Sequence, residues 1–215
     1  MVQKSKKPHS PAPQPKRRGR PRAYQPDIAL GRALDLFRKR GFAATSLDDL
    51  SAATGMNRPS LYGAFGDKRE LYIKSYQRYR DDARAAMGNI FREQTPIRKR
   101  LQQIFAVALN IYLSGEAGPR GCFTVVTAAS DAVADPEIRA MVLEGLVELD
   151  KAFAFCFRAA RENGELPASA DPGVLAQLAS ATMHSMAIRA RARVPRKELE
   201  AMAKGAIDLI CGCEG

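Results

Sequence analysis

The chain has 215 residues and a formal net charge of +11, from 34 Lys and Arg against 23 Asp and Glu. It offers no apolar segment before residue 28 that would form a secretory signal, and no run of about 20 apolar residues that would span a membrane. Its four cysteines are irregularly spaced, which indicates reduced thiols, and we therefore expect a cytoplasmic protein.

The positive charge is concentrated at the N-terminus. Residues 1–24 contain eight Lys and Arg and no acidic residue, whereas the other 26 basic residues are nearly balanced by the 23 acidic ones. With five prolines in the same segment, residues 1–23 are predicted to form a disordered basic arm. Its Arg18-Gly19-Arg20-Pro21 resembles the core of an AT-hook, in which Arg-Gly-Arg lies in the narrow minor groove of A·T-rich DNA. Arg18 and Arg20 are therefore candidate DNA contacts, although an arm that binds phosphates without reading sequence explains the same composition.

From residue 27 onward the apolar spacing is helical. The predicted first helix ends before Gly41, and its buried stripe consists of Leu30, Ala33, Leu34 and Phe37. Residues 45–65 then predict two short helices separated by a tight turn. Thr45 is the expected N-cap of the first of these helices, and Asp48 completes a capping-box-like start. This is the pattern of a DNA-reading helix-turn-helix.

The turn and the second short helix carry the most specific local signals. Gly55 is expected to end the preceding helix in a left-handed conformation, which glycine adopts without a steric cost. Asn57 then caps the second helix. With Leu61 and Phe65 turned inward, the outward face consists of Arg58, Ser60, Tyr62 and Gly63. Such a short, polar face fits a major groove, and a helical hairpin used only for packing is the alternative.

Five longer helices are expected beyond this motif, at about residues 67–91, 96–114, 136–163, 171–193 and 195–211. Between them, residues 121–133 form a short apolar segment. Its β-branched run at 124–127 makes a strand conceivable, but the helical surroundings favour a buried helix. Because the chain has no strand alternation, hairpin signal or internal repeat, the expected fold class is all-α.

Residues 24–72 resemble the TetR/AcrR family of bacterial transcriptional regulators. The residues that carry the resemblance are Ala33 to Phe37, Gly41, Phe42, Thr45, Ser46, Leu50, Ala53, Gly55, Leu61, Tyr62, Phe65 and Lys68. The resemblance implies a homodimer in which residues 24–83 form the helix-turn-helix DNA-binding domain. Residues 84–215 would then form a C-terminal ligand-binding and dimerisation domain.

The resemblance also implies which residues contact DNA. The residues expected at the major groove are Arg58, Pro59, Ser60 and Tyr62, and those expected at phosphates are Thr45, Ser46, Tyr62 and Lys68. Many family members carry His or Tyr where this chain has Ala64, so one contact common in relatives is absent here. The arginine-rich arm is a candidate to replace it.

An inducer pocket is expected among the apolar and aromatic residues of the C-terminal part. The candidate lining is Phe105, Leu109, Tyr112, Cys122, Phe123, Phe153 and Phe157, and ordinary core packing explains the same residues. The long helix after Asp67 is the expected link to the DNA-binding part, with Tyr76, Tyr79 and Met87 inward. These linings favour a small hydrophobic or electrophilic inducer.

The cysteines and histidines offer few candidates for other chemistry. Cys122 lies near a predicted helix start and beside Arg120, two features that favour a reactive thiolate, and a small buried hydrophobic residue is the alternative. Arg120-Gly121-Cys122 is similar to a subset of the family that includes electrophile- or metal-responsive repressors. Cys211 and Cys213 lack a third metal ligand nearby, and His184 lies on an apolar helix as an interior or interface residue. No metal site and no cofactor are expected.

These observations together predict a regulator and not an enzyme, because no Gly-rich phosphate loop, HExxH motif or nucleophile–base pair is present. The expected function is a ligand-released repressor that binds a palindromic DNA operator as a homodimer. The last two helices are the expected dimer interface, on an apolar face of Leu199, Met202, Ala203, Ala206, Ile207 and Ile210. A ligand-independent architectural DNA-binding protein is the alternative, since it would use the same arm and motif.

Overall fold

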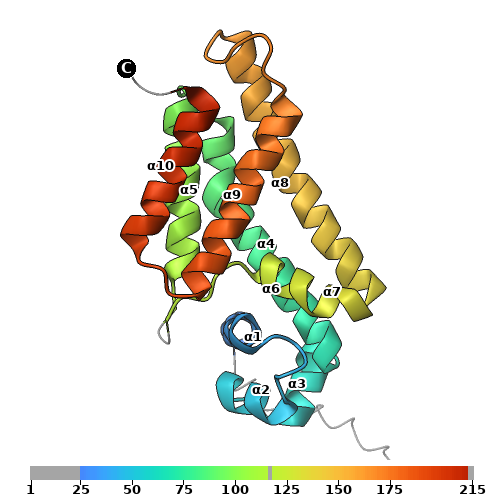
Figure 1. Ribbon diagram of the computed structural model, residues 1–215. Helices are drawn as coiled ribbons and strands as arrows, with labels where there is room; N and C mark the ends of the chain where they lie inside the picture. Colours follow the sequence, from blue (N-terminus) through green and yellow to red (C-terminus); the bar gives the residue numbers. More distant parts are fainter. Residues whose placement is uncertain (1–24, 116–117, 213–215) are drawn as a thin grey trace, which may run out of the picture.

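A computed structural model describes residues 25–115 and 118–212. Within these ranges the chain forms ten α-helices and no strand, which confirms the all-α prediction (Figure 1). The helices are α1 Pro26–Arg40, α2 Leu47–Thr54, α3 Arg58–Phe65, α4 Lys68–Arg92, α5 Ile97–Leu113, α6 Phe123–Ala129, α7 Asp131–Ala134, α8 Pro136–Glu162, α9 Pro172–Arg191 and α10 Arg196–Cys211. Residues 124–127 are helical, so the alternative of a strand there is wrong. No helix in the described part of the chain is long and apolar enough to cross a membrane.

The helix-turn-helix forms as predicted, with one correction at its start. Ser46, and not Thr45, caps α2: its side chain accepts from the Asp49 N–H, while the Asp49 carboxylate accepts from the Ser46 N–H at 3.0 Å. Thr45 is buried, and its hydroxyl donates to the carbonyl of Gly41 at 2.7 Å. Two hydroxyl residues in succession can both cap a helix, and the burial of Thr45 decides between them.

The turn between α2 and α3 follows the sequence signals. Gly55 has φ 73° and ψ 15°, the left-handed conformation expected after α2. The side chain of Asn57 accepts from the N–H of Ser60 at 2.9 Å and so caps α3. Leu61 and Phe65 are buried against the rest of the N-terminal helices. This packing fixes which side of α3 is exposed.

Helix α4 runs from the helix-turn-helix into the C-terminal part (Figure 1). Asp67 and Glu70 form a capping box at its start, three residues after α3 ends. Its 25 residues span roughly 37 Å at 1.5 Å per residue, and it packs against α1, α5 and α8. A movement of α4 would therefore be felt at both ends of the molecule.

The C-terminal part is a bundle in which α8 and α9 lie side by side and α10 packs on α5 and α9 (Figure 1). The apolar face of α10 differs from our expectation. Leu199, Ala203 and Ile207 are buried within the chain, and the other three residues of that face pack against the same core. Half of this face is therefore buried within the chain, and Met202, Ala206 and Ile210 stay partly exposed.

Candidate nucleic-acid interface and ligand cavity

The exposed side of α3 carries a polar surface with one aromatic side chain. Tyr62 is 46% exposed, and Arg58 forms a two-pronged ion pair with Asp48 of α2, with closest N–O distances of 2.8 Å. Both partners of this pair are largely exposed, so the pair contributes little stability. Arg58 can therefore exchange the carboxylate for a base edge or a phosphate at small cost.

The other predicted phosphate contacts differ in how available they are. Ser46 is exposed, although its hydroxyl is engaged in the α2 cap. Lys68 is half-buried, and its ammonium lies over the ring of Phe42, 4.2 Å from the ring centre. The buried Thr45 side chain has no free surface for a phosphate. The predicted contacts of Arg18 and Arg20 lie outside the described residues.

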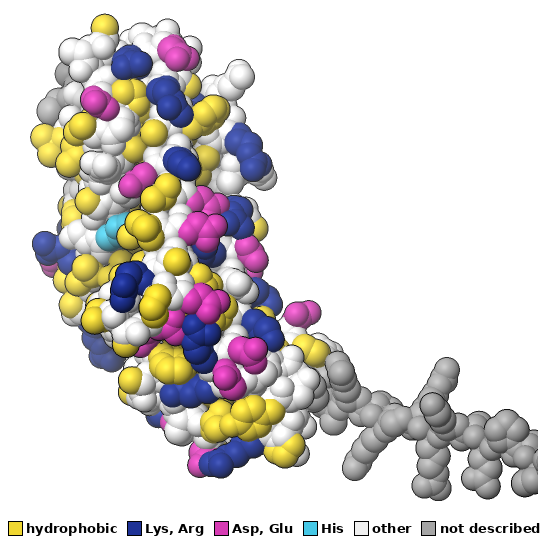
Figure 2. All heavy atoms as spheres, turned by 90° about the vertical axis from the view of Figure 1, so that its right-hand side faces the viewer, with side chains coloured by type: hydrophobic (Ala, Val, Ile, Leu, Met, Phe, Trp, Pro, Cys, Tyr) yellow, Lys and Arg dark blue, Asp and Glu magenta, His cyan; other side chains and the backbone are white. Residues whose placement is uncertain are grey.

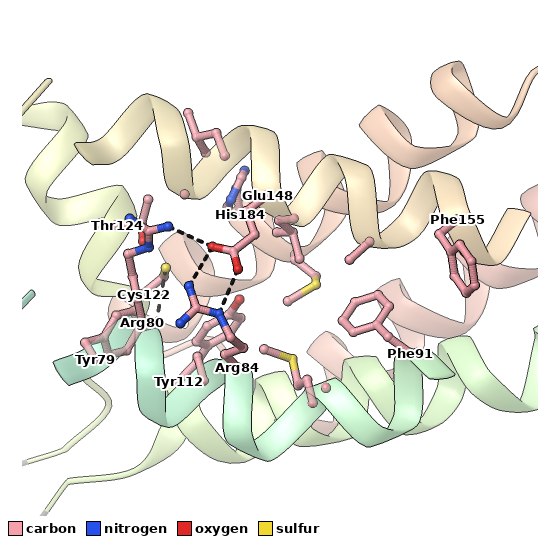
Figure 3. A pocket seen from close by; sticks show the side chains of 18 of the residues that line it. Tyr79, Arg80, Arg84, Phe91, Tyr112, Cys122, Thr124, Glu148, Phe155 and His184 are labelled. Atoms are coloured by element: carbon pink, nitrogen blue, oxygen red, sulfur yellow. Dashed lines mark hydrogen bonds and ion pairs between the residues drawn. The ribbon is translucent and has the colours of Figure 1, made fainter. Parts of the chain in front are cut away.

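A cavity of about 540 Å³ opens between α4, α8 and α9, with the end of α5 and the start of α6 closing one end (Figure 3). Most of its wall is apolar. The apolar lining side chains are Ala83, Met87, Phe91, Leu146, Leu149, Ala152, Phe155 and Met183. Its size and lining suit a small apolar molecule.

Neutral polar groups gather at the closed end of the cavity. The hydroxyl of Tyr79 donates to the sulfur of Cys122 at 3.3 Å, whereas the hydroxyl of Tyr112 makes no hydrogen bond to any described residue. Burial raises the pKa of both Tyr79 and Tyr112, so both phenols stay protonated. Burial also lowers the pKa of His184, against the weaker effect of Asp150, which favours a neutral imidazole. This end therefore offers hydrogen-bonding groups without net charge.

A charged cluster forms another part of the wall (Figure 3). Glu148 of α8 accepts from Arg84 at 2.7 Å and from Arg80 at 2.7 Å, and Arg80 also donates to Glu144 at 2.9 Å. The hydrogen bonds from Arg84 and then Arg80 outweigh burial and lower the pKa of Glu148 to about 2. The cluster joins α4 to α8 across the cavity, so a ligand that separates these helices must strain it.

Three arginines connect the cavity end to α1. Arg38 is buried, donates to the carbonyls of Gly121 at 2.7 Å and Ile111 at 3.2 Å, and lies over the ring of Tyr79 at 5.1 Å. Arg120 pairs with Asp35 of α1, and Arg191 of α9 donates to the carbonyl of Arg38 at 2.7 Å. Since Tyr79 lines the cavity and contacts Arg38, a residue of α1, a change there is one contact away from α1.

Metal chemistry has no candidate centre in this structure: across residues 25–115 and 118–212, no group of three His, Cys, Asp or Glu side chains is arranged to hold an ion.

Comparison with known proteins agrees with this geometry. Residues 29–74 match the family model described as bacterial regulatory proteins, tetR family. Residues 98–205, half of the chain, match the model of the tetracyclin repressor-like C-terminal domain. The chain belongs to the TetR family.

Individual TetR-family relatives cover most of the chain. The HTH-type transcriptional repressor ComR of Escherichia coli (strain K12) is 34% identical over 179 residues, which span 82% of this chain and 84% of ComR. A cysteine mutant of the regulator CifR, solved with a 26-bp operator DNA, is 28% identical with a TM-score of 0.80 and covers 89% of this chain and all of that one. Reduced E. coli NemR, 20% identical with a TM-score of 0.74 over 88% of this chain and 98% of its own, supports the fold alone.

The TetR-type cavity contains only part of the lining expected from the sequence. Tyr112 and Cys122 lie on its wall. The other expected residues lie in the packed core behind it, each at most 1% exposed: Phe105, Leu109, Phe123, Phe153 and Phe157. Phe123, for example, is enclosed by the rings of Tyr72, Tyr76 and Tyr79. Core and cavity wall share one apolar stripe on each helix, so periodicity does not separate them.

Sequence reasoning missed the charged cluster, although a signal for it exists in this TetR-family chain. Arg80 and Arg84 are four residues apart on one helix, and Glu144 and Glu148 are four apart on another. Matched spacing of opposite charges within two predicted helices indicates that the two faces meet.

Proposed function

We propose that this protein is a ligand-responsive transcriptional regulator that binds a palindromic operator as a homodimer and is released by its ligand. Residues 24–83 would form the DNA-binding domain and residues 84–215 the ligand-binding and dimerisation domain. The observation that carries the proposal is the continuity between the two: α4 starts next to α3 and ends along the cavity wall. A ligand that fits only one arrangement of α4 shifts the population toward that arrangement.

In this proposal α3 lies in the major groove, with Arg58, Pro59, Ser60 and Tyr62 at the bases. Arg58 leaves Asp48 when DNA binds, and Ser46 and Lys68 face phosphates. The test measures fluorescence anisotropy of operator and scrambled duplexes with Arg58→Ala and Arg40→Ala. Arg40 is a matched control because it also pairs with an α2 carboxylate, Asp49, at 2.6 Å.

Both variants lose one positive charge, so both should bind the scrambled duplex equally. Only Arg58→Ala should lose preference for the operator, by roughly 1–3 kcal/mol per chain if Arg58 bonds a base edge. Equal operator preference in the two variants would remove α3 from base recognition.

For the homodimer we propose an interface on α8 and α9. Apolar side chains stay exposed on both helices, at four-residue spacing that puts them on one side: Leu143 and Val147 on α8, and Val174 and Leu178 on α9. Figure 2 displays hydrophobic side chains along the face that carries α8, interrupted by basic and acidic ones. Apolar side chains that stay exposed together on a surface are a common mark of association sites. The α10 part of our expectation is not retained, since half of its apolar face is buried within the chain and the rest packs against the same core.

Light scattering separates these two interfaces. Wild type should have twice the chain mass of 23.5 kDa, and Leu143→Glu/Leu178→Glu should have the mass of one chain. Leu209→Glu is the control, because Leu209 on α10 is 90% exposed and lies outside the proposed face. If Leu209→Glu has the mass of one chain while Leu143→Glu/Leu178→Glu stays dimeric, the interface lies on α10 and not on the proposed face.

The ligand is proposed to be small, largely apolar and uncharged. Arg80, Arg84 and Glu148 of the cavity wall are already paired with one another, whereas the fourth charged lining residue, Arg92, makes no ion pair among the described residues; the closed end offers the side chains of Tyr112, Cys122 and His184. A charged ligand at this cluster would have to displace an ion pair, whereas an apolar one with a single polar group fits the wall as it stands. An electrophile is a special case, since Cys122 lies on the wall and could form a covalent bond.

A further inference from the structure

A second hollow, separate from the ligand cavity, lies between α1 and the C-terminal part. It encloses about 490 Å³ and shares no lining residue with the first cavity. Its walls come from α1, from the end of α2, from residues 118–120 and from the C-terminal end of α9, which comes down beside α1 (Figure 1). We call this hollow the basic groove.

The groove is strongly cationic. Five of its ten lining residues are basic, namely Arg32, Lys39, Arg120, Arg191 and Arg193, and Asp35 is its one acidic residue. Asp35 pairs with Arg120. The other four cations have no acidic partner among the described residues: Arg191 donates only to backbone carbonyls, and the rest make no ion pair. Like charges crowded into a concave surface repel one another and attract a counter-ion.

Arg193 is brought to the groove by the C-terminal cap of α9. It is the one non-glycine residue with positive φ in the described chain, at φ 65°. Helices commonly end on a residue in this left-handed conformation, and here the N–H of Arg193 donates to the carbonyl of Ala190 at 2.9 Å and that of Val194 to the carbonyl of Arg189 at 3.0 Å. This conformation ends α9 and sets the Arg193 guanidinium beside Gly118 at the groove. The cap therefore places a cation without an acidic partner among the described residues at the groove.

We propose that the basic groove binds a small phosphate-bearing anion from solution, such as a diphosphate. Guanidinium groups match phosphate oxygens in two-pronged geometry, and several of them converge here. The volume is large enough for a diphosphate or a nucleotide. DNA phosphates are the other source of this chemistry, but a groove walled in part by α9 and residues 118–120 encloses a compact anion better than a duplex backbone.

The proposal goes beyond operator binding and does not depend on it. A bound anion would bridge α1 to the end of α9, beside the existing bonds of Arg191 to the carbonyls of Arg38 and Lys39. An anion bound in the groove would therefore act on the contact between α1 and the end of α9, separately from a ligand in the apolar cavity.

Calorimetric titration of the full-length, DNA-free protein with inorganic pyrophosphate tests the site. The groove variant is Arg32→Ala/Arg193→Ala, which removes two exposed side chains that make no hydrogen bond or ion pair with residues 25–115 and 118–212. The control, Lys99→Ala/Lys197→Ala, removes the same charge from exposed positions on α5 and α10. Wild type and control should bind equally, and the groove variant should bind at least roughly tenfold more weakly, since charge-assisted bonds to phosphate are lost.

Two outcomes would overturn the proposal. Equal pyrophosphate affinity in the groove and control variants would mean that any binding belongs to other basic residues. These include the N-terminal arm, which wild type and all variants share. Operator affinity lost only in the groove variant, with unchanged pyrophosphate binding, would assign these cations to the DNA backbone. Arg32→Lys/Arg193→Lys, which keeps the charge, should recover part of the affinity. Because the titration contains no DNA, failure here leaves the proposed regulator function untouched.

Discussion

Removing the hydroxyl group of Tyr72 would loosen α4 from α6 and α7, which carry the two hydrogen-bond partners of that hydroxyl. Tyr72 is fully buried on α4, and its hydroxyl bonds Asp131 at 2.5 Å and Thr127 at 2.8 Å. The Asp131 side chain is mostly buried and has no other hydrogen-bond donor in the described chain. In Tyr72→Phe the ring stays in place against Phe37 and Phe123, while the carboxylate loses its donor.

These contacts determine how much the free energy of unfolding should fall. A hydrogen bond to a charged group contributes about 1.5–3 kcal/mol, and a buried acceptor left without a partner adds a desolvation penalty. We therefore expect Tyr72→Phe to lower the free energy of unfolding by about 3 kcal/mol. Tyr112→Phe is a matched control, because Tyr112 is also a buried tyrosine, but its hydroxyl is at the cavity wall and makes no hydrogen bond to a described residue; its effect should stay within about 0.5 kcal/mol.

Urea unfolding followed by circular dichroism measures both variants, at one protein concentration because the stability of the proposed dimer would depend on it. The midpoint should fall clearly for Tyr72→Phe and stay near wild type for Tyr112→Phe. Equal midpoints for the two variants would refute the reasoning, since the buried carboxylate would then have found another partner.

Three further predictions concern the arm, the cluster and the thiol. Deleting residues 1–22 should weaken binding to every DNA sequence and flatten its salt dependence, as measured by anisotropy from low to high salt, because fewer counter-ions are released; an unchanged salt slope would mean that the arm does not contact DNA. The pKa of Glu148 is lowered to about 2, so its ion pairs stabilise the fold above about pH 4.5 and are lost as the pH falls toward 2. The unfolding free energies of wild type and Glu148→Gln should therefore converge over that range in urea titrations, and a constant difference would contradict the pKa shift. N-ethylmaleimide should reduce operator affinity of wild type but not of Cys122→Ser, because the adduct adds volume to the cavity; equal responses would leave a noncovalent ligand.

The fold could be predicted from the sequence largely because its helix ends are signalled by individual residues. Gly55, Asn57 and Asp67 each do in the structure what their chemistry predicts. The error at Thr45 is of one residue and arises because its neighbour Ser46 caps equally well. Whether residues 121–133 were strand or helix depended on the surrounding helices and not on the segment itself.

The cavity could be predicted much less well. A helical stripe shows that Phe153 and Phe157 face inward, but a tightly packed ring and a cavity wall have the same periodicity. The same limit applies to α10, whose apolar face packs on α5 and α9 of the same chain. Which inward face is left incompletely filled depends on how three or four helices pack together, which no single helix encodes.

The central claim, a dimeric reader of a specific operator, is tested most directly by sequencing the duplexes that the purified protein selects from a random pool. The proposed function predicts enrichment of an inverted repeat, with half-site centres about one helical turn or roughly 35 Å apart, matching two α3 helices related by a twofold axis. Enrichment of a single unrepeated site, or of A·T-rich DNA without any motif, would contradict it.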